Sequence, residues 1–249
     1  MTDSLGYRLK LGIVAPSTNT SVQPEMDDMR PPGVTNHFSR AFIPDNPITS
    51  DADFEQLMVD IRASMETAVE QVITCDPDRL VMGMSSETFW DGAAGAHALE
   101  QRMRDAAGGR PVTMGSDAVN DALQRYGKIR RIAVVTPYMP VADKQVQRYF
   151  EDCGYEIVAL EGLKCSSPVQ IAHTSPRQLR DAIVKVNDPS VEAIVQVGTN
   201  LAAAKLAAMA EFWLDKPVLA INTAIYWHAL RASGIDDKVQ GFGSLLADH

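Results

Sequence analysis

Cysteine is scarce in this chain: only Cys75, Cys153 and Cys165 occur among its 249 residues. An odd number at such wide spacing offers no disulfide framework, and no C-x-x-C pair or Cys/His cluster supplies the ligands of a structural zinc ion. The spacings of a phosphate-binding P-loop and of a G-x-G-x-x-G dinucleotide loop are missing as well. The sequence therefore predicts no metal site and neither of these two nucleotide-binding loops.

Long apolar runs and an excess of positive charge are also absent. No run approaches the ~20 apolar residues that cross a bilayer, and residues 1–6 lack the basic start and apolar stretch of a secretion signal, so we expect a cytoplasmic location. The formal net charge of −9 argues against nucleic acid and against an anionic membrane as partners. A small anionic substrate is compatible with this charge, because helix N-termini attract anions locally.

Strand-like runs and helical patterns alternate through nearly the whole chain. The runs typical of buried strands lie at 9–15, 35–43, 79–84, 111–114, 131–136, 155–161, 191–197 and 217–221. The helical patterns lie at 51–74, from the third strand to about 107, and at 116–126, 141–152, 176–186, 201–213 and 222–233. Strands and helices in alternation predict an α/β fold whose parallel sheets are flanked by helices.

A weak internal repeat divides the chain into two halves. The segment Gly12-Ile13-Val14-Ala15-Pro16 opens the first half, and Ala133-Val134-Val135-Thr136-Pro137 opens the second. Ligands of parallel α/β folds bind beyond the carboxyl ends of the strands, so equivalent loops of the two halves would face one cleft. We expect an N-terminal lobe at 1–115, a C-terminal lobe at 116–221, and residues 222–249 packed on the N-terminal lobe.

Two short turns, one in each half, combine Gly with small polar residues after a buried run. Ser85 and Ser86 follow the run that begins at residue 79, and Thr199 and Asn200 follow the run that begins at residue 191. Backbone N–H groups and hydroxyls at helix N-termini would bind a carboxylate or a phosphate there. The alternative is two ordinary capped helices, but the occurrence of the pattern at matched places favours a paired anion site.

Four further residues are candidates for the same cleft. Asn19, in the loop 16–20, offers hydrogen-bond donors and an acceptor, although it could simply cap a helix. Tyr138 could bond a substrate oxygen or donate a proton, or pack as an aromatic lid. Glu87 could act as a general base if burial raised its pKa, or merely complement a helix dipole. Cys165 could approach the cleft, whereas a free cysteine is more often a small buried apolar residue.

Four segments, taken in order, resemble the aspartate/glutamate racemase superfamily, on the branch of the maleate cis-trans isomerases and arylmalonate decarboxylases. They are Pro16-Ser17-Thr18-Asn19-Thr20, Met84-Ser85-Ser86, Thr136-Pro137-Tyr138-Met139 and Gly198-Thr199-Asn200-Leu201. The resemblance implies two Rossmann-like lobes with parallel sheets, related by a pseudo-twofold axis, with a cleft between them. It also implies cofactor-independent chemistry next to a carboxylate, with the substrate oxygens held by Asn19, Ser85, Ser86, Tyr138, Thr199 and Asn200.

The chain departs from this family pattern at the tips of both turns. The resemblance implies catalytic cysteines there, two in racemases and isomerases and one, in the second turn, in arylmalonate decarboxylases, whereas this chain has Met84 in the first turn and Gly198 in the second. A thioether carries no proton and glycine has no side chain, so thiol chemistry is not available at these positions. The groups expected to bind a carboxylate are present, but the acid/base pair is missing.

We therefore expect an enzyme that acts on a small mono- or dicarboxylic acid, of the lyase or decarboxylase type, through an enediolate-like intermediate. Tyr138, Glu87 or a water would transfer protons, and the turns would stabilise the developing negative charge. One alternative is a cis-trans isomerase or racemase that uses Cys165 or Glu87 in place of the thiols. Another is a non-catalytic protein that binds carboxylates. The expected partner is the small carboxylate itself, and the chain could form a homo-oligomer.

Overall fold

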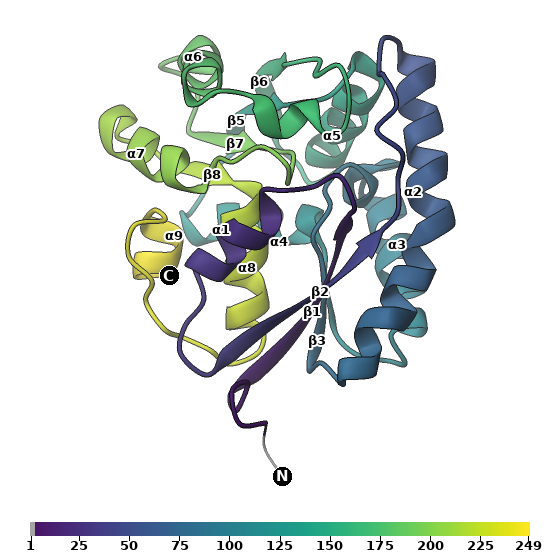
Figure 1. The fold of residues 1–249 in the computed structure, drawn as a ribbon. Coiled ribbons are helices and arrows are strands. Elements are labelled where there is room, and N and C mark those ends of the chain that lie inside the picture. Colours follow the sequence, from purple (N-terminus) through teal and green to yellow (C-terminus); the bar gives the residue numbers. More distant parts are fainter. Residues whose placement is uncertain (1–2) are drawn as a thin grey trace.

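Two parallel four-stranded sheets form the framework of the computed structural model, which describes residues 3–249. The first sheet has the strand order β2-β1-β3-β4 and the second has the order β6-β5-β7-β8, with every neighbouring pair parallel. The order is the same in both sheets, as the internal repeat predicts. The expected α/β fold with two parallel sheets is confirmed (Figure 1).

The strands and helices alternate along the chain. The first sheet consists of β1 (Leu9–Pro16), β2 (Val34–Ala41), β3 (Arg79–Met82) and β4 (Val112–Thr113). The second sheet consists of β5 (Arg131–Thr136), β6 (Glu156–Gly162), β7 (Ala193–Gln196) and β8 (Val218–Ala220). The helices are α1 (Val22–Asp28), α2 (Asp51–Val72), α3 (Gly92–Ala106), α4 (Gly115–Arg125), α5 (Pro140–Asp152), α6 (Pro176–Val186), α7 (Ala204–Leu214), α8 (Ile221–Arg231) and α9 (Ser244–Asp248).

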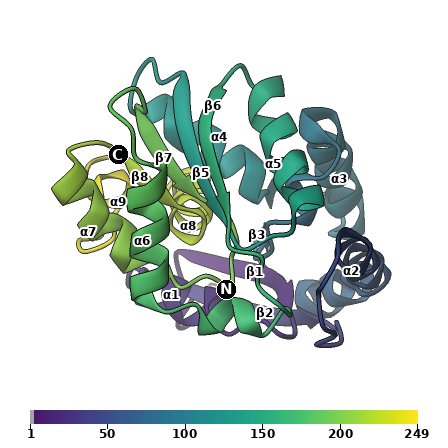
Figure 2. The same ribbon diagram turned by 90° about the horizontal axis from the view of Figure 1, so that it is seen from above.

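Helices cover both faces of each sheet. Helix α2 packs on β1 and β2 and contacts α3, whereas α8 packs on β3 and β4 and contacts α1 and α4. In the second sheet, α5 packs on β6, and α6 contacts both β5 and β6 from the other side (Figure 2). The predicted division at residues 115 and 116, and the assignment of 222–249 to the first lobe, stay predictions.

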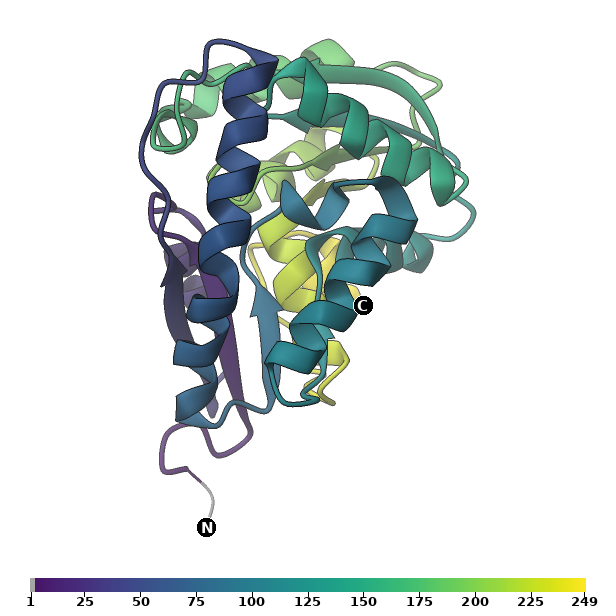
Figure 3. The same cartoon turned by 90° about the vertical axis from the view of Figure 1, so that its right-hand side faces the viewer.

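Helix α2 links the two halves of the molecule physically. Its buried positions recur at helical spacing along one face, and Ser50 caps its start by accepting a hydrogen bond from the Asp53 N–H. The helix runs beside the first sheet and reaches α5 of the second half (Figure 3). A long helix in this place covers the region where the ends of the strands of the two sheets meet.

The helices that follow the two polar turns begin later than the sequence indicates. After Ser85 and Ser86 there is only a 3₁₀ helix, Glu87–Phe89, and α3 starts at Gly92. After Thr199 and Asn200 the chain makes a further turn, and α7 starts at Ala204. The expectation that both turns open directly into α-helix N-termini was wrong, because hydrogen bonds inside each turn take the place of a first helical turn.

Two helices were missed by the sequence analysis. Helix α1 is short, contains Pro24 and buries only Val22 and Met26, so its apolar periodicity is weak. Helix α9 has five residues near the end of the chain. Within residues 3–249, no helix is long and apolar enough to cross a membrane.

Candidate functional site

A narrow cavity lies where the carboxyl ends of the strands of the two sheets meet. Its volume is about 50 Å³, which is room for only a few water molecules at about 10–15 Å³ each. The polar side chains predicted from the sequence gather here from both halves of the chain. They are Asn19, Ser85, Ser86, Tyr138, Thr199 and Asn200, and Met84 and Gly198 line the cavity beside them.

A chain of hydrogen bonds joins four of these residues across the two halves. The Asn19 Nδ2 donates to Thr199 Oγ1 at 3.0 Å, and the Thr199 N–H donates to Ser85 Oγ at 3.1 Å. Ser85 Oγ and the Tyr138 hydroxyl lie 2.6 Å apart. The loop after β1, the turn after β3, the turn after β7 and the segment after β5 are thus bonded to one another at one place.

This chain of bonds leaves hydroxyl protons without protein acceptors. Thr199 Oγ1 accepts from Asn19, and its own proton has no acceptor among residues 3–249. Only one of the two hydroxyls of Ser85 and Tyr138 can donate to the other, so one proton of that pair is also left over. Two hydroxyl protons of residues that line the cavity are therefore available to an anion.

Backbone N–H groups of the two turns are free as well. In the described part of the chain, the N–H groups of Ser86 and Asn200 donate to no protein acceptor, and they occupy equivalent positions in the repeat. Neither residue lies in a helix or a strand, so no regular hydrogen-bond ladder accounts for them. Both residues line the cavity, and free N–H groups in such turns are a typical means of binding a carboxylate.

Most of the remaining cavity wall is apolar, and α2 supplies three of its residues. Phe54, Leu57 and Ile61 line it from this helix, and no acidic or basic side chain of the described residues does so. The rings of Tyr138 and Phe54 pack edge to face, with their centroids 5.4 Å apart. Burial in this setting raises the pKa of the Tyr138 phenol well above its ordinary value, so the residue carries its proton throughout the neutral range.

Glu87 is buried beside the cavity but does not line it. One carboxylate oxygen, Oε1, accepts from Arg62 Nε at 2.7 Å, and the other has no protein partner in the described chain. Burial raises the pKa of this carboxyl, and the bond to Arg62 opposes the rise. Arg62, on α2, thus holds the Glu87 side chain. The catalytic role of Glu87 stays a prediction.

The residues at the tips of the two turns, Met84 and Gly198, have different surroundings. Met84 is fully buried. Gly198 has a φ of +123°, and a Cβ added to it would lie 2.5 Å from Cδ of Pro137. Glycine is therefore required at the second tip in this conformation, because a side chain would meet both strained backbone and a rigid proline ring.

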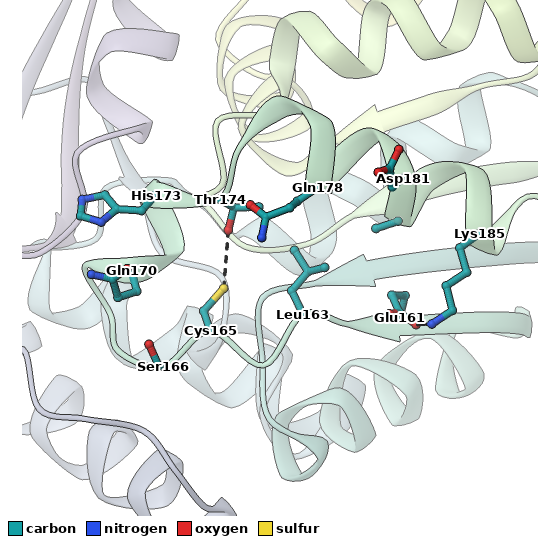
Figure 4. A pocket seen from close by; sticks show the side chains of 11 residues that line it. Glu161, Leu163, Cys165, Ser166, Gln170, His173, Thr174, Gln178, Asp181 and Lys185 are labelled. Carbon is teal, nitrogen blue, oxygen red and sulfur yellow. Dashed lines mark hydrogen bonds and ion pairs between the residues drawn. The ribbon is translucent and has the colours of Figure 1, made fainter.

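Cys165 lies outside the cavity, in a separate surface pocket of about 450 Å³ (Figure 4). Its Sγ lies 3.6 Å from Thr174 Oγ1, and burial raises the pKa of the thiol. Cys75 and Cys153 do not line the cavity either. Within residues 3–249, no group of three or more His, Cys, Asp or Glu side chains could hold a metal ion.

Sequence reasoning missed the apolar side of the site. Phe54, Leu57 and Ile61 appear in the sequence as ordinary core positions of an amphipathic helix, and Ile171 belongs to the short 3₁₀ helix Gln170–His173. Nothing in their local pattern separates them from residues that pack on the sheet. The path of α2, which packs on the first sheet and reaches α5, brings Phe54, Leu57 and Ile61 to the cavity; Figure 3 shows the course of this helix.

Comparisons with known proteins match nearly the whole chain. A family model described as arylmalonate decarboxylase matches residues 11–246. The maleate isomerase of Nocardia farcinica is 25% identical over 250 residues, covering 97% of this chain and 96% of that protein. A mutant of the Nocardia farcinica enzyme, solved with a covalently bound succinylcysteine intermediate, superposes with a TM-score of 0.86 at 23% identity over 97% of this chain and 99% of that one. A liganded mutant of arylmalonate decarboxylase superposes with a TM-score of 0.81 at 20% identity, over 97% and 100% of the two chains.

Proposed function

The chain belongs to the arylmalonate decarboxylase family, and from this premise we propose that it is a cofactor-independent enzyme acting next to the carboxylate of a small carboxylic acid. The reaction proposed is decarboxylation of a malonate-type acid through an enediolate-like intermediate. The observation that carries this proposal is the pair of free N–H groups, at Ser86 and Asn200, in two turns that line one cavity.

In the proposed reaction, the polar turns hold the carboxylate that the product keeps. The leaving carboxylate lies against Phe54, Leu57 and Ile61, where a charged group is poorly solvated and its loss as neutral CO₂ is favoured. The bond between the α-carbon and the leaving carboxylate breaks, and its electron pair moves onto the retained carboxylate as an enediolate. Free N–H and O–H donors stabilise that developing charge.

Tyr138 supplies the proton in this scheme. Its high pKa keeps the phenol protonated at neutral pH, and the enediolate is basic enough to take that proton at the α-carbon. Water then returns a proton to the phenolate. We further propose that Met84 and Gly198 stand where family members carry thiols, so no thiol takes part.

The test is an assay of malonate and methylmalonate, which are small enough for the cavity, for CO₂ release. In Tyr138→Phe we expect kcat to fall about a hundredfold or more, as for the loss of a general acid. Tyr155→Phe is the matched control, because the Tyr155 hydroxyl bonds Asn120 away from the cavity, and it should keep wild-type kcat. Absence of CO₂ release from every malonate tested, or full activity in Tyr138→Phe, contradicts the proposal.

A second candidate, cis-trans isomerisation of maleate, is favoured by the higher TM-score to the maleate isomerase structure. The covalent succinylcysteine of that relative requires a cysteine in the site, and no cysteine of residues 3–249 lines the cavity. Formation of fumarate from maleate would support this candidate. Stabilisation by dicarboxylates without any turnover would instead indicate a binding protein. The predicted homo-oligomer and cytoplasmic location stay predictions.

A further inference from the structure

The two peptide groups of the second turn are each held by a buried side-chain amide. Gln196 Nε2 donates to the Gly198 carbonyl at 2.9 Å, and Asn222 Nδ2 donates to the Thr199 carbonyl at 2.9 Å. Both side chains are 1% exposed. In a trans peptide the C=O and N–H point in opposite directions, so fixing a carbonyl also fixes the next N–H.

Each carbonyl that is held in this way sets the direction of the N–H that follows it. The Thr199 N–H, opposite the carbonyl held by Gln196, donates to Ser85 Oγ. The Asn200 N–H, opposite the carbonyl held by Asn222, donates to no protein acceptor in the described chain. A turn of this kind could otherwise relax by flipping the peptide between Thr199 and Asn200, which would present a carbonyl oxygen to an anion.

Glu25 fixes which way the Asn222 amide faces. Its Oε2 accepts from Asn222 Nδ2 at 2.7 Å, and its Oε1 accepts from the Ala204 N–H at the start of α7 at 2.9 Å. A carboxylate only accepts hydrogen bonds, so it selects the NH₂ end of the Asn222 side chain. Both hydrogens of that NH₂ are then used, one by Glu25 and one by the Thr199 carbonyl.

From these contacts we infer that Asn222 and Glu25 are positioning residues that direct the Asn200 N–H at the bound carboxylate, while Gln196 orients the preceding peptide, whose N–H bonds Ser85. They touch no substrate themselves. Glu25 lies on α1, which packs on β2 of the first sheet, whereas the turn follows β7 of the second. The geometry of the anion site in one half of the chain is thus set by a carboxylate from the other half. This inference rests on the proposed function for the identity of the anion.

The test uses the Asn222→Asp substitution, which keeps the shape of the side chain and replaces its donor with an acceptor. A second carboxylate beside Glu25 could prevent folding, so the double variant Glu25→Gln with Asn222→Asp is made as well. There the amide introduced at position 25 donates to the new carboxylate, while the Thr199 carbonyl still faces an acceptor. Asn120→Asp is the matched control, because Asn120 only accepts from Tyr155 and a carboxylate can do the same.

Two readouts are taken from ¹⁵N-labelled protein. The first is the N–H residual dipolar coupling of Asn200 without ligand, which reports the orientation of its peptide. The second is a titration with malonate, followed at the amides of Ser86 and Asn200. In the double variant we expect a changed coupling at Asn200, a malonate response at Ser86 only, and affinity weaker by about tenfold or more, as for one hydrogen bond to a charged group.

An unchanged Asn200 coupling in the double variant, with malonate affinity within about twofold of wild type (under 0.5 kcal/mol), overturns the inference. If malonate moves neither turn amide in the wild-type protein, the proposed function fails. The dipolar couplings of the ligand-free proteins then still decide whether Asn222 sets the orientation of the peptide.

Discussion

The two polar turns occupy equivalent places in the repeat but are held in different ways. In the first turn, the Ser85 carbonyl accepts from the N–H and the Oγ1 of Thr88, three residues further on. In the second, the equivalent Thr199 carbonyl accepts from Asn222, and Glu25 orients that side chain. Both arrangements leave the following N–H, of Ser86 or Asn200, without a protein acceptor in the described chain.

This difference indicates how the two halves of the site depend on the fold. The Ser85 carbonyl of the first turn is held by the turn's own 3₁₀ helix, so the orientation of that peptide requires no side chain from a distant element. The second turn has one internal bond, from the Leu201 N–H to the Gly198 carbonyl, but its Thr199 carbonyl requires α8 and α1, and its tip requires glycine. We therefore expect the second turn to be the more sensitive of the two to substitution.

The largest expected difference in stability is between cysteines placed at the two tips. Gly198→Cys should lower the free energy of unfolding by about 3 kcal/mol, because the residue would keep a positive φ and its Cβ would meet Pro137. Met84→Cys only shortens a buried side chain and should cost about 1–2 kcal/mol. Urea denaturation measures both values.

Gly127→Cys separates the two causes at Gly198. Gly127 also has a positive φ, +96°, but nothing lies within 4 Å of an added Cβ. It should lose only the about 1–2 kcal/mol that a left-handed backbone costs a residue with a side chain. If Gly198→Cys proves as stable as Gly127→Cys, contact with Pro137 does not restrict the second tip.

A smaller effect concerns Asp143, which holds the segment carrying Tyr138. Asp143 accepts a hydrogen bond from the Thr136 hydroxyl, and Thr136 Oγ1 accepts from the Tyr138 N–H. Burial raises the pKa of Asp143 from 3.8 to about 6. As pH rises from about 4 to about 6, Asp143 loses its proton in the unfolded chain but keeps it in the folded protein. The contribution of this carboxyl to stability is therefore complete below about pH 4 and is lost as pH rises towards about 6.

Urea denaturation across this pH range should show wild type losing about 1–2 kcal/mol relative to Asp143→Asn. Asp188 depends on pH in the opposite direction. Hydrogen bonds from Ser190 lower the pKa of this carboxyl, so its contribution to stability is lost as pH falls. Parallel curves for wild type and Asp143→Asn would mean that Asp143 titrates alike in the folded and unfolded chains.

The smallest expected effect is on the first turn. Thr88→Val keeps the shape of a fully buried side chain and removes the hydroxyl that donates to Ser85. The Thr88 N–H still holds the same carbonyl at 3.0 Å. We expect the free energy of unfolding to fall by about 1 kcal/mol and malonate binding to stay near the wild-type level. A loss of binding as large as that expected for the Asn222 variants would remove the contrast between the turns.

Much of the fold could be predicted from local pattern. The bounds of β5 and α6 agree with the sequence analysis residue by residue, because each is a strong periodic run with clear ends. The gathering of Asn19, Ser85, Tyr138 and Thr199 also followed from the rule that equivalent strands deliver their loops to one place.

The rest depends on contacts that sequence spacing does not reveal. Glu25 and Asn222 are 197 positions apart, and nothing near either of them indicates the other. The apolar wall formed by Phe54, Leu57 and Ile61 depends on the path of α2 across the strand ends. The late starts of α3 and α7 depend on hydrogen bonds inside the turns, which compete with helix initiation.

The most direct test of the central claim is a crystal structure of the Tyr138→Phe variant grown with malonate. The claim predicts one carboxylate between the two turns, within hydrogen-bond distance of the N–H groups of Ser86 and Asn200, with the other carboxylate against the apolar residues of α2. Malonate bound only in the surface pocket beside Cys165, or bound in the cavity with neither N–H in contact, would contradict it.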